Sequence, residues 1–183
     1  KNYNSHSYDL DELIYCLLIR YDTLFSRGNQ WSMPTSVKEN FRKKFNINFE
    51  IFASSFNHHY DYYCSIFYDI EKYFMSIGPF QNVRYIKGFY MANPPYEEKL
   101  LYQMYSVIEK SSDNTNDNLT FIIGTPSWDK YKFELHDIIK KSKYYRSSYK
   151  LQDKEVRWYD FIEKNYMRIP SNIRYVLSLS LIH

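Results

Sequence analysis

The feature that most constrains this chain is a turn with two consecutive prolines, which stands between a strand-like run and a helix-like run. Residues 84–92 are rich in aromatic and β-branched side chains, and residues 97–110 place apolar side chains at helical spacing. The turn itself consists of Asn93, Pro94, Pro95 and Tyr96. In open α/β sheets, ligands bind at the carboxyl ends of strands. The pattern therefore predicts an α/β fold with a candidate site at this turn.

The residue types of the turn suit a planar amino group. Proline fixes φ and has no N–H, so two in succession hold the carbonyls of Asn93 and Pro94 in set directions. The side-chain oxygen of Asn93 and the carbonyl of Pro94 can accept both hydrogens of an exocyclic amine such as adenine N6. The Tyr96 ring can stack on the base, which is worth on the order of 1–3 kcal/mol. Pro-Pro beside an asparagine is also common in ordinary loops, so a purely structural turn stays open as an alternative.

Four segments, in order along the chain, carry a resemblance to a known family. They are residues 49–57 (FEIFASSFN), 62–80 (YYCSIFYDIEKYFMSIGPF), 88–100 (GFYMANPPYEEKL) and 119–128 (LTFIIGTPSW). The region from about Leu13 to the carboxyl end resembles the catalytic domain of the cap-specific adenosine N6-methyltransferases, also described as the phosphorylated-CTD-interacting factor family. Residues 93–96 resemble the Asp/Asn-Pro-Pro-Tyr/Phe motif of amino-group methyltransferases. One departure is Ser55-Phe56, where the family pattern leads us to expect Pro-Leu.

The resemblance implies a Rossmann-like fold of the S-adenosylmethionine-dependent methyltransferases, with a mostly parallel sheet and an antiparallel edge strand. A chain of 183 residues has room for one such domain. We expect a single methyltransferase domain over 1–183, with a short N-terminal helical segment over 1–46 and the sheet and catalytic core over 47–183. Within it we expect helices near 8–25, from Thr35 or Ser36, and inside 58–77, and a polar loop over 111–118. Strands are expected at 49–53 and 119–124, and residues 143–151 and 173–182 should pair antiparallel at the sheet edge.

The resemblance also implies roles for individual residues. The catalytic turn would be Asn93, Pro94, Pro95 and Tyr96. The cofactor S-adenosylmethionine would contact Ala53, Ser54, Asn57 and Asn93, because a methyltransferase of this kind receives its cofactor after the first strand. The substrate would contact Tyr96, Glu98 and Trp128: Glu98 would pair with a cationic 7-methylguanine, and Trp128 would stack on a base. A carboxylate in the first turn of a helix is stabilised by the helix dipole in any case, and a tryptophan after a strand often serves packing.

Composition limits the class of protein. A hydrophobic fraction of 44% argues against disorder, and the apolar runs are too short to cross a membrane. With no secretory h-region after the amino terminus, we expect an intracellular protein, in the nucleus or the cytoplasm. Cys16 and Cys64 stand in apolar runs without a CxxC pair, so we expect two buried thiols and no metal site.

The charge pattern leaves the partner open. A net charge of +3 neither requires nor excludes a nucleic acid. The basic clusters at 42–44 and 140–146 would either track phosphates or form solvated surface.

The first functional reading is an S-adenosylmethionine-dependent adenine N6-methyltransferase acting on RNA, at the first transcribed adenosine beside the 7-methylguanosine cap of mRNA. The protein would contribute positioning and electrostatics. One alternative is adenine in DNA or internal RNA, flipped out of its stack. Another is a catalytically silent subunit on the same fold that binds nucleic acid or a partner. A protein partner that supplies substrate recognition is compatible with each reading.

Overall fold

The computed structural model describes residues 9–24, 30–126, 134–151, 157–160, 165–168 and 172–178. The helices are α1 (Leu10–Asp22), α2 (Thr35–Phe45), α3 (Tyr68–Glu71), α4 (Glu98–Asp113) and α5 (Glu134–Lys141), with 3-10 turns at Lys72–Phe74 and Phe80–Asn82. The strands are β1 (Trp31–Ser32), β2 (Phe49–Glu50), β3 (Tyr62–Tyr63), β4 (Gly88–Ala92), β5 (Leu119–Pro126), β6 (Tyr145–Leu151), β7 (Arg157–Asp160), β8 (Asn165–Arg168) and β9 (Asn172–Ser178).

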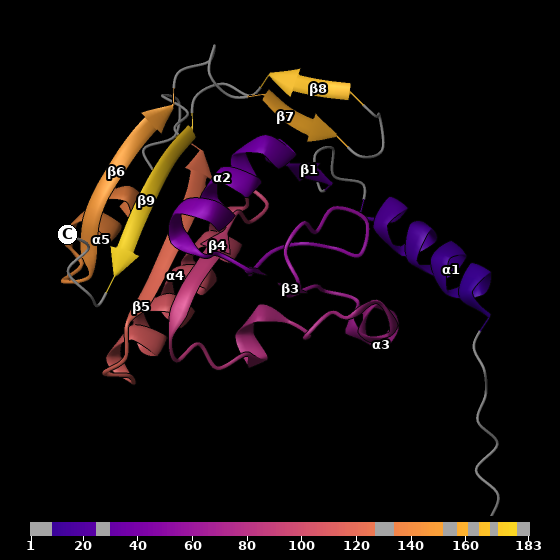
Figure 1. Ribbon diagram of the computed structural model, residues 1–183, viewed down its shortest axis with the longest axis horizontal. Coiled ribbons are helices and arrows are strands. Elements are labelled where there is room, and N and C mark those ends of the chain that lie inside the picture. The colour runs from indigo at the N-terminus through magenta and orange to yellow at the C-terminus, as the bar shows by residue number, and fades with distance from the viewer. Residues whose placement is uncertain are drawn as a thin grey trace, which may run out of the picture.

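A mixed sheet of six strands, in the order β3-β2-β4-β5-β9-β6, forms the centre of the molecule (Figure 1). The first four strands of this order run parallel, and β9 is antiparallel to both of its neighbours. Strand β6 therefore points the same way as β5. The mostly parallel sheet and the antiparallel pairing of β6 with β9 are confirmed. The predicted position of the antiparallel strand is wrong. Strand β9 is not at the edge of the sheet but lies between β5 and β6, because it also pairs with β5 from Pro126 to Thr120.

Side chains on β4 and β5 alternate between two apolar layers, as the period of a strand requires. Ala92, Phe121 and Ile123 pack in one layer with buried residues of α4 and α5. Met91 and Ile122 pack in the other, together with partly buried residues of α2. In Figure 1, α4 and α5 lie behind the sheet and α2 lies in front of it. Each fully buried large side chain contributes roughly 1.5–3 kcal/mol, so the two layers fix how the strand ends sit relative to the helices.

A small antiparallel sheet, in the order β1-β7-β8, lies beside the large one and was not predicted from the sequence. Its strands are two to four residues long, and the paired residues Trp31 and Asp160 are 129 positions apart in the sequence. Such short, distant strands leave no periodic pattern to read. Trp158 of β7 is nevertheless 1% exposed and packs into the layer beneath α2.

The segment 58–77 contains a helix, as predicted, but the helix is short. Only Tyr68–Glu71 is α-helical, with the 3-10 turn after it, and Tyr62–Tyr63 forms β3 beside β2. Ser76 then bridges back to Tyr63, and Gly78 takes a φ of +115°, which glycine adopts without strain. The chain therefore doubles back where a longer helix would have carried it away. The first strand is also shorter than predicted, although Ile51 N still donates to Met91 O at 2.8 Å. Helix α4 extends to Asp113, into the predicted polar loop.

Helix α1 buries only a narrow stripe of its predicted apolar face. Leu17 and Tyr21 pack against Ile70 of α3, whereas Leu10 and Leu18 are 58% and 51% exposed. The predicted burial of Cys16 is wrong, because this residue lies outside the stripe and is exposed, while Cys64 is buried as predicted. Within the described residues, no helix is long and apolar enough to span a bilayer.

Candidate active site

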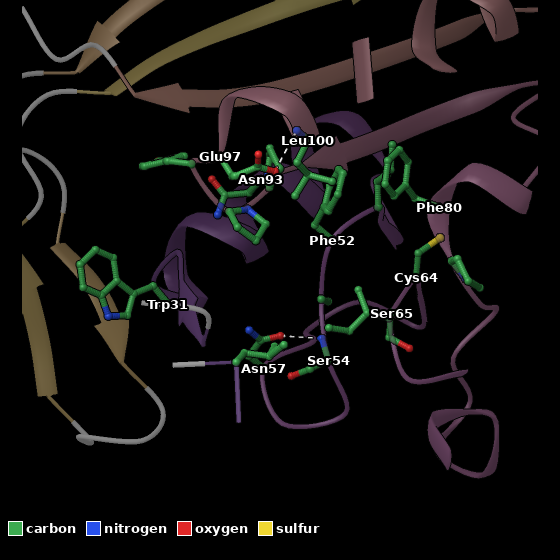
Figure 2. Close-up of a pocket in the computed structure, with 18 of the residues that line it drawn as sticks. Trp31, Phe52, Ser54, Asn57, Cys64, Ser65, Phe80, Asn93, Glu97 and Leu100 are labelled. Carbon is green, nitrogen blue, oxygen red and sulfur yellow. Dashed lines mark hydrogen bonds between the residues drawn. The ribbon is translucent and has the colours of Figure 1, made fainter. Parts of the chain in front are cut away.

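A cavity of about 440 Å³ opens where β2, β3 and β4 end (Figure 2). The residues that follow these three strands line it, at 51–54, 64–66 and 93–97. Strand β2 lies between β3 and β4. The chain therefore passes from β2 to β3 on one side of it and then to β4 on its other side. Ligands of open α/β sheets bind at such a switch point. The volume lies within the range of small-molecule sites.

The turn at residues 93–96 forms one side of this cavity. All four residues line it, with Pro94 buried, Asn93 and Tyr96 half-buried and Pro95 exposed. Glu97 N donates to the Pro95 carbonyl at 2.8 Å, which closes the turn. The Glu97 carboxylate then accepts from Leu100 N at 3.1 Å and caps α4. The strand, the turn and the start of the helix therefore follow one another as predicted.

The loop at residues 54–57 lies across the cavity from Asn93 and Glu97, as Figure 2 shows. Ser54 N donates to Asn57 Oδ1 at 2.8 Å, and Ser54 Oγ donates to Gln30 Oε1 at 2.7 Å. Ser54 and Asn57 are buried, and both line the cavity together with Ala53. The structure thus brings the predicted cofactor residues and the predicted catalytic turn to one cavity.

An apolar wall joins these two sides. Phe52 and Phe80 lie with ring centroids 4.6 Å apart, next to Leu100. Cys64 also lines the cavity, and burial raises the pKa of its thiol to about 12 against a weaker, opposing hydrogen bond with Tyr85. A thiol with this pKa stays protonated near neutral pH, so Cys64 does not serve as a nucleophile there.

A buried ion pair lies beneath the site. Lys38 Nζ is 2.6 Å from Glu50 Oε1, and their side chains are only 4% and 2% exposed. The contact is short, yet Glu50 Oε1 has no aligned hydrogen bond, so charge attraction holds it. Lys38 Nζ also donates to the Asn57 carbonyl at 3.3 Å, and a small void is lined by Glu50, Asn57 and Asn93. The pair therefore supports both sides of the cavity.

One predicted substrate residue, Glu98, lies away from the cavity, and another, Trp128, stays a prediction. Glu98 is exposed and does not line the cavity; the carboxylate that does is Glu97. The reason is that Glu97 caps α4 in an extended conformation, whereas Glu98 is already the first residue of the helix. Trp128 lies outside the described residues. Two other tryptophans that the sequence reading missed, Trp31 and Trp158, line the cavity.

The basic clusters lie away from the cavity. Residues 42–44 end α2 just before β2 begins, and residues 140–146 lead into β6, so both clusters stand at the amino ends of strands that run the same way. The cavity is at the opposite edge. Arg42 also donates to the His59 carbonyl at 3.0 Å, and Lys143 pairs with Asp113 at 2.7 Å. This placement does not support phosphate tracking by these clusters next to the cavity.

In the described part of the chain, no group of three or more His, Cys, Asp or Glu side chains is placed to hold a metal ion. The charged side chain among the described lining residues is Glu97. The site is thus a mostly apolar cavity with amide, hydroxyl and carbonyl groups at two of its sides.

Comparison with known proteins gives two results. The chain is 37% identical over 121 residues to the mRNA (2'-O-methyladenosine-N(6)-)-methyltransferase of Mus musculus and 36% identical over 121 residues to that of Homo sapiens. Each match covers 63% of this chain and 17% of the relative, so the chain spans about a sixth of the length of these curated relatives. A family model described as "Phosphorylated CTD interacting factor 1 WW domain" matches residues 1–161; that description names a WW domain, not a catalytic one. By this match, the chain belongs to the phosphorylated CTD interacting factor 1 family.

Proposed function

We propose that this chain forms the cofactor-binding and catalytic core of an S-adenosylmethionine-dependent adenine N6-methyltransferase that acts on the cap-adjacent adenosine of mRNA. The observation that carries the proposal is the meeting of residues 93–96 with residues 53, 54 and 57 in one cavity. The names of the two relatives, which describe adenosine N6 methylation in mRNA, agree with this proposal.

The sheet supports the catalytic assignment. Parallel strands β3, β2, β4 and β5, followed by an inserted antiparallel β9, fit a Rossmann-like methyltransferase fold within a single domain. The matched region 1–161 includes the strands that end at the cavity. A six-stranded sheet with helices on both faces suits a binding crevice at its strand ends.

The cavity has the chemistry that S-adenosylmethionine requires. Phe52, Phe80 and Leu100 offer apolar surface for a planar purine, and Ser54 and Asn57 offer hydroxyl and amide groups for ribose or amino-acid atoms. When bound, this cofactor supplies an electrophilic methyl group. The residues of the chain would hold it with its methyl group toward the turn at 93–96.

The turn would orient the acceptor amine. Asn93 Oδ1 and the Pro94 carbonyl would accept its two hydrogens and direct the nitrogen lone pair toward the cofactor side of the cavity. Tyr96 would stack on the adenine ring. The chain need not supply a general base, because the alkylated nitrogen is strongly acidic and releases its proton readily.

The cap would lie near Glu97 and Trp31. Both residues line the cavity, Glu97 is exposed, and Trp31 is half-buried, so both reach solvent. A carboxylate and an aromatic face are what a cationic 7-methylguanine favours. Glu97 here takes the role that the sequence reading gave to Glu98.

A methyl-transfer assay with tritiated S-adenosylmethionine tests the proposal on four matched oligonucleotides: capped RNA, triphosphate-ended RNA, internal-adenosine RNA and single-stranded DNA. We expect capped RNA to be preferred by at least about tenfold in kcat/KM, equivalent to ~1.4 kcal/mol. Glu97→Gln should reduce this preference, whereas Glu98→Gln, at the neighbouring exposed position, should not.

The outcomes separate the alternatives. Equal rates on capped and uncapped RNA would contradict the cap assignment and leave the methyltransferase in place. A higher rate on DNA or on internal-adenosine RNA would show that this nucleic acid, and not the cap-adjacent adenosine, is the substrate. Transfer to none of the four, despite binding of the cofactor, would indicate a silent subunit or the need for a partner.

A further inference from the structure

We propose that Glu71 is a positioning residue that holds the loop at residues 54–57 in the shape that receives the cofactor. This inference rests on the proposed function. Glu71 lies at the end of α3, does not line the cavity and would act through the loop.

The Glu71 carboxylate is fully buried and gathers donors from three segments. Oε1 accepts from Ser55 N at 2.8 Å and from Ser55 Oγ at 3.2 Å. Oε2 accepts from Tyr21 Oη at 3.0 Å and from Phe67 N at 3.2 Å. A buried carboxylate costs several kcal/mol unless donors satisfy it, so these four bonds fix where Ser55, Tyr21 and Phe67 can lie.

No cation shares this role in the part of the chain that the structure describes, because none of the ion pairs found there includes Glu71. The carboxylate is thus held by directed N–H and O–H groups. Bonds of this kind to a charged group are short and depend strongly on angle, more so than attraction to a mobile ammonium. Glu71 therefore works as a template for the backbone around Ser55.

Ser55 is the position where the family pattern led us to expect proline. Proline has no N–H and no hydroxyl, and it would lose both bonds to Glu71 Oε1. Ser55 Oγ also lies 2.9 Å from Tyr63 Oη. Because the Tyr63 hydroxyl donates its own proton to the Phe74 carbonyl at 2.6 Å, the single Ser55 hydroxyl proton is shared between Tyr63 and Glu71. In this chain, hydrogen bonds to the buried Glu71 carboxylate thus hold the loop, and a proline at position 55 would remove two of them.

The hydrogen bonds of Glu71 lead directly to residues that line the cavity. Ser54, next to Ser55, lines it, as do Asn57 and Tyr21. Ser54 N donates to Asn57 Oδ1, and Phe56 N donates to Ser54 Oγ at 3.2 Å, so the loop moves as one unit. If Ser55 shifted away from Glu71, Ser54 and Asn57 would shift with it.

Three variants test the inference, with isothermal titration of S-adenosylmethionine into the full chain as the readout. Glu71→Gln keeps the shape but turns one acceptor into an NH₂ group that faces donors. Ser55→Pro removes the N–H, and Ser55→Ala, the matched control, removes only the hydroxyl. We expect Kd to rise on the order of tenfold or more in the first two and by less than about threefold in Ser55→Ala.

Two further measurements distinguish a positioning role of Glu71 in cofactor binding from a purely structural role. Each titration is made well below the melting temperature of the variant, and steady-state kinetics should show a raised KM for S-adenosylmethionine with kcat changed less than KM. Wild-type Kd in a folded Glu71→Gln protein would overturn the inference while the proposed function stands. Absence of binding by the wild-type chain would instead overturn the proposed function.

Amide exchange of the unmodified protein gives a test that needs no variant. The Ser55 N–H, bonded to a buried carboxylate, should exchange on the order of 100-fold more slowly than the amide of an open loop. Addition of S-adenosylmethionine should slow it further, because a ligand that binds the ordered loop opposes its opening. Unprotected exchange at Ser55, or no response to a cofactor that binds, would contradict the inference.

Discussion

The two loops that face each other across the cavity are made rigid in different ways. The turn at 93–96 owes its shape to two prolines, which restrict φ within the chain itself. The loop at 54–57 contains no proline, and its shape depends on Glu71, Gln30 and Tyr63 from distant parts of the sequence. One half of the site is encoded locally and the other by tertiary contacts.

This difference has a consequence for stability and for function. A locally encoded turn tolerates changes elsewhere in the molecule, whereas a loop held by tertiary hydrogen bonds responds to substitutions well away from the cavity. Between the two lies the Lys38–Glu50 pair, which reaches the Asn57 carbonyl and borders a void that Asn93 also lines. Substitutions at these places test the comparison.

The largest effect is expected from Lys38→Met, which leaves the Glu50 carboxylate buried without its cation. Loss of one partner of a buried pair costs about 3–5 kcal/mol of unfolding free energy. Arg20→Met is the control, because the Arg20–Asp69 pair is 2.7 Å long but exposed, and such pairs contribute about 1 kcal/mol or less. Urea unfolding measures both variants; similar costs would show that the Lys38–Glu50 pair does not hold the two loops together.

Asn93→Ala should have the next largest effect, mainly on catalysis. The amide orients the acceptor amine, so its loss should lower kcat on the order of 10²-fold or more, with little change in cofactor Kd. Asn48→Ala, an exposed asparagine just before β2, serves as the control. A methyl-transfer rate equal to that of the wild type in Asn93→Ala would remove this residue from the proposed mechanism.

Pro95→Ala should have a small effect on stability, as expected of a turn whose shape is encoded locally. Pro95 is exposed, and its carbonyl, which any residue provides, accepts from Glu97 N. The expected cost is about 0.4–1 kcal/mol, from the greater freedom of the unfolded chain. Thermal unfolding measures it. A loss of several kcal/mol would show that the turn, like the opposite loop, depends on its surroundings.

The smallest effect near neutral pH is expected from two buried groups close to the loop at 54–57, the Cys64 thiol and the Tyr63 hydroxyl. Burial raises the pKa of the Cys64 thiol and of the Tyr63 hydroxyl to about 12 in the folded chain, from ordinary values of 9.0 and 10.0. The folded state therefore keeps protons that the unfolded chain releases above pH 9, so the unfolding free energy should fall as pH rises from about 9 to 12. Urea unfolding over this range should show a shallower decline in Cys64→Ala and Tyr63→Phe; unchanged slopes would contradict the assignment.

The sequence predicted what depends on local pattern. The strand–turn–helix unit around Asn93, the pairing of β6 with β9 and the burial of Cys64 were all predictable from residue order. The role of Glu71 was not, because a glutamate within YDIEKYF is typical of solvated surface, and its burial depends on contacts with Tyr21 and Ser55 from distant segments. The same holds for Trp158, which reaches the cavity through a strand of four residues. Glu97 lines the cavity and Glu98 does not, because the start of α4, to within one residue, decides which carboxylate faces the cavity.

Calorimetric titration of S-adenosylmethionine into the wild-type chain and into Ala53→Trp shows whether the cavity between residues 53–57 and 93–96 is the cofactor site. Ala53 lines the cavity and is half-buried, so an indole at this position would fill space that the cofactor needs. We predict one binding site in the wild-type chain, retained in Asn93→Ala and lost in a folded Ala53→Trp. Absence of binding to the folded wild-type chain up to about 1 mM cofactor, or full binding to Ala53→Trp, would contradict the account.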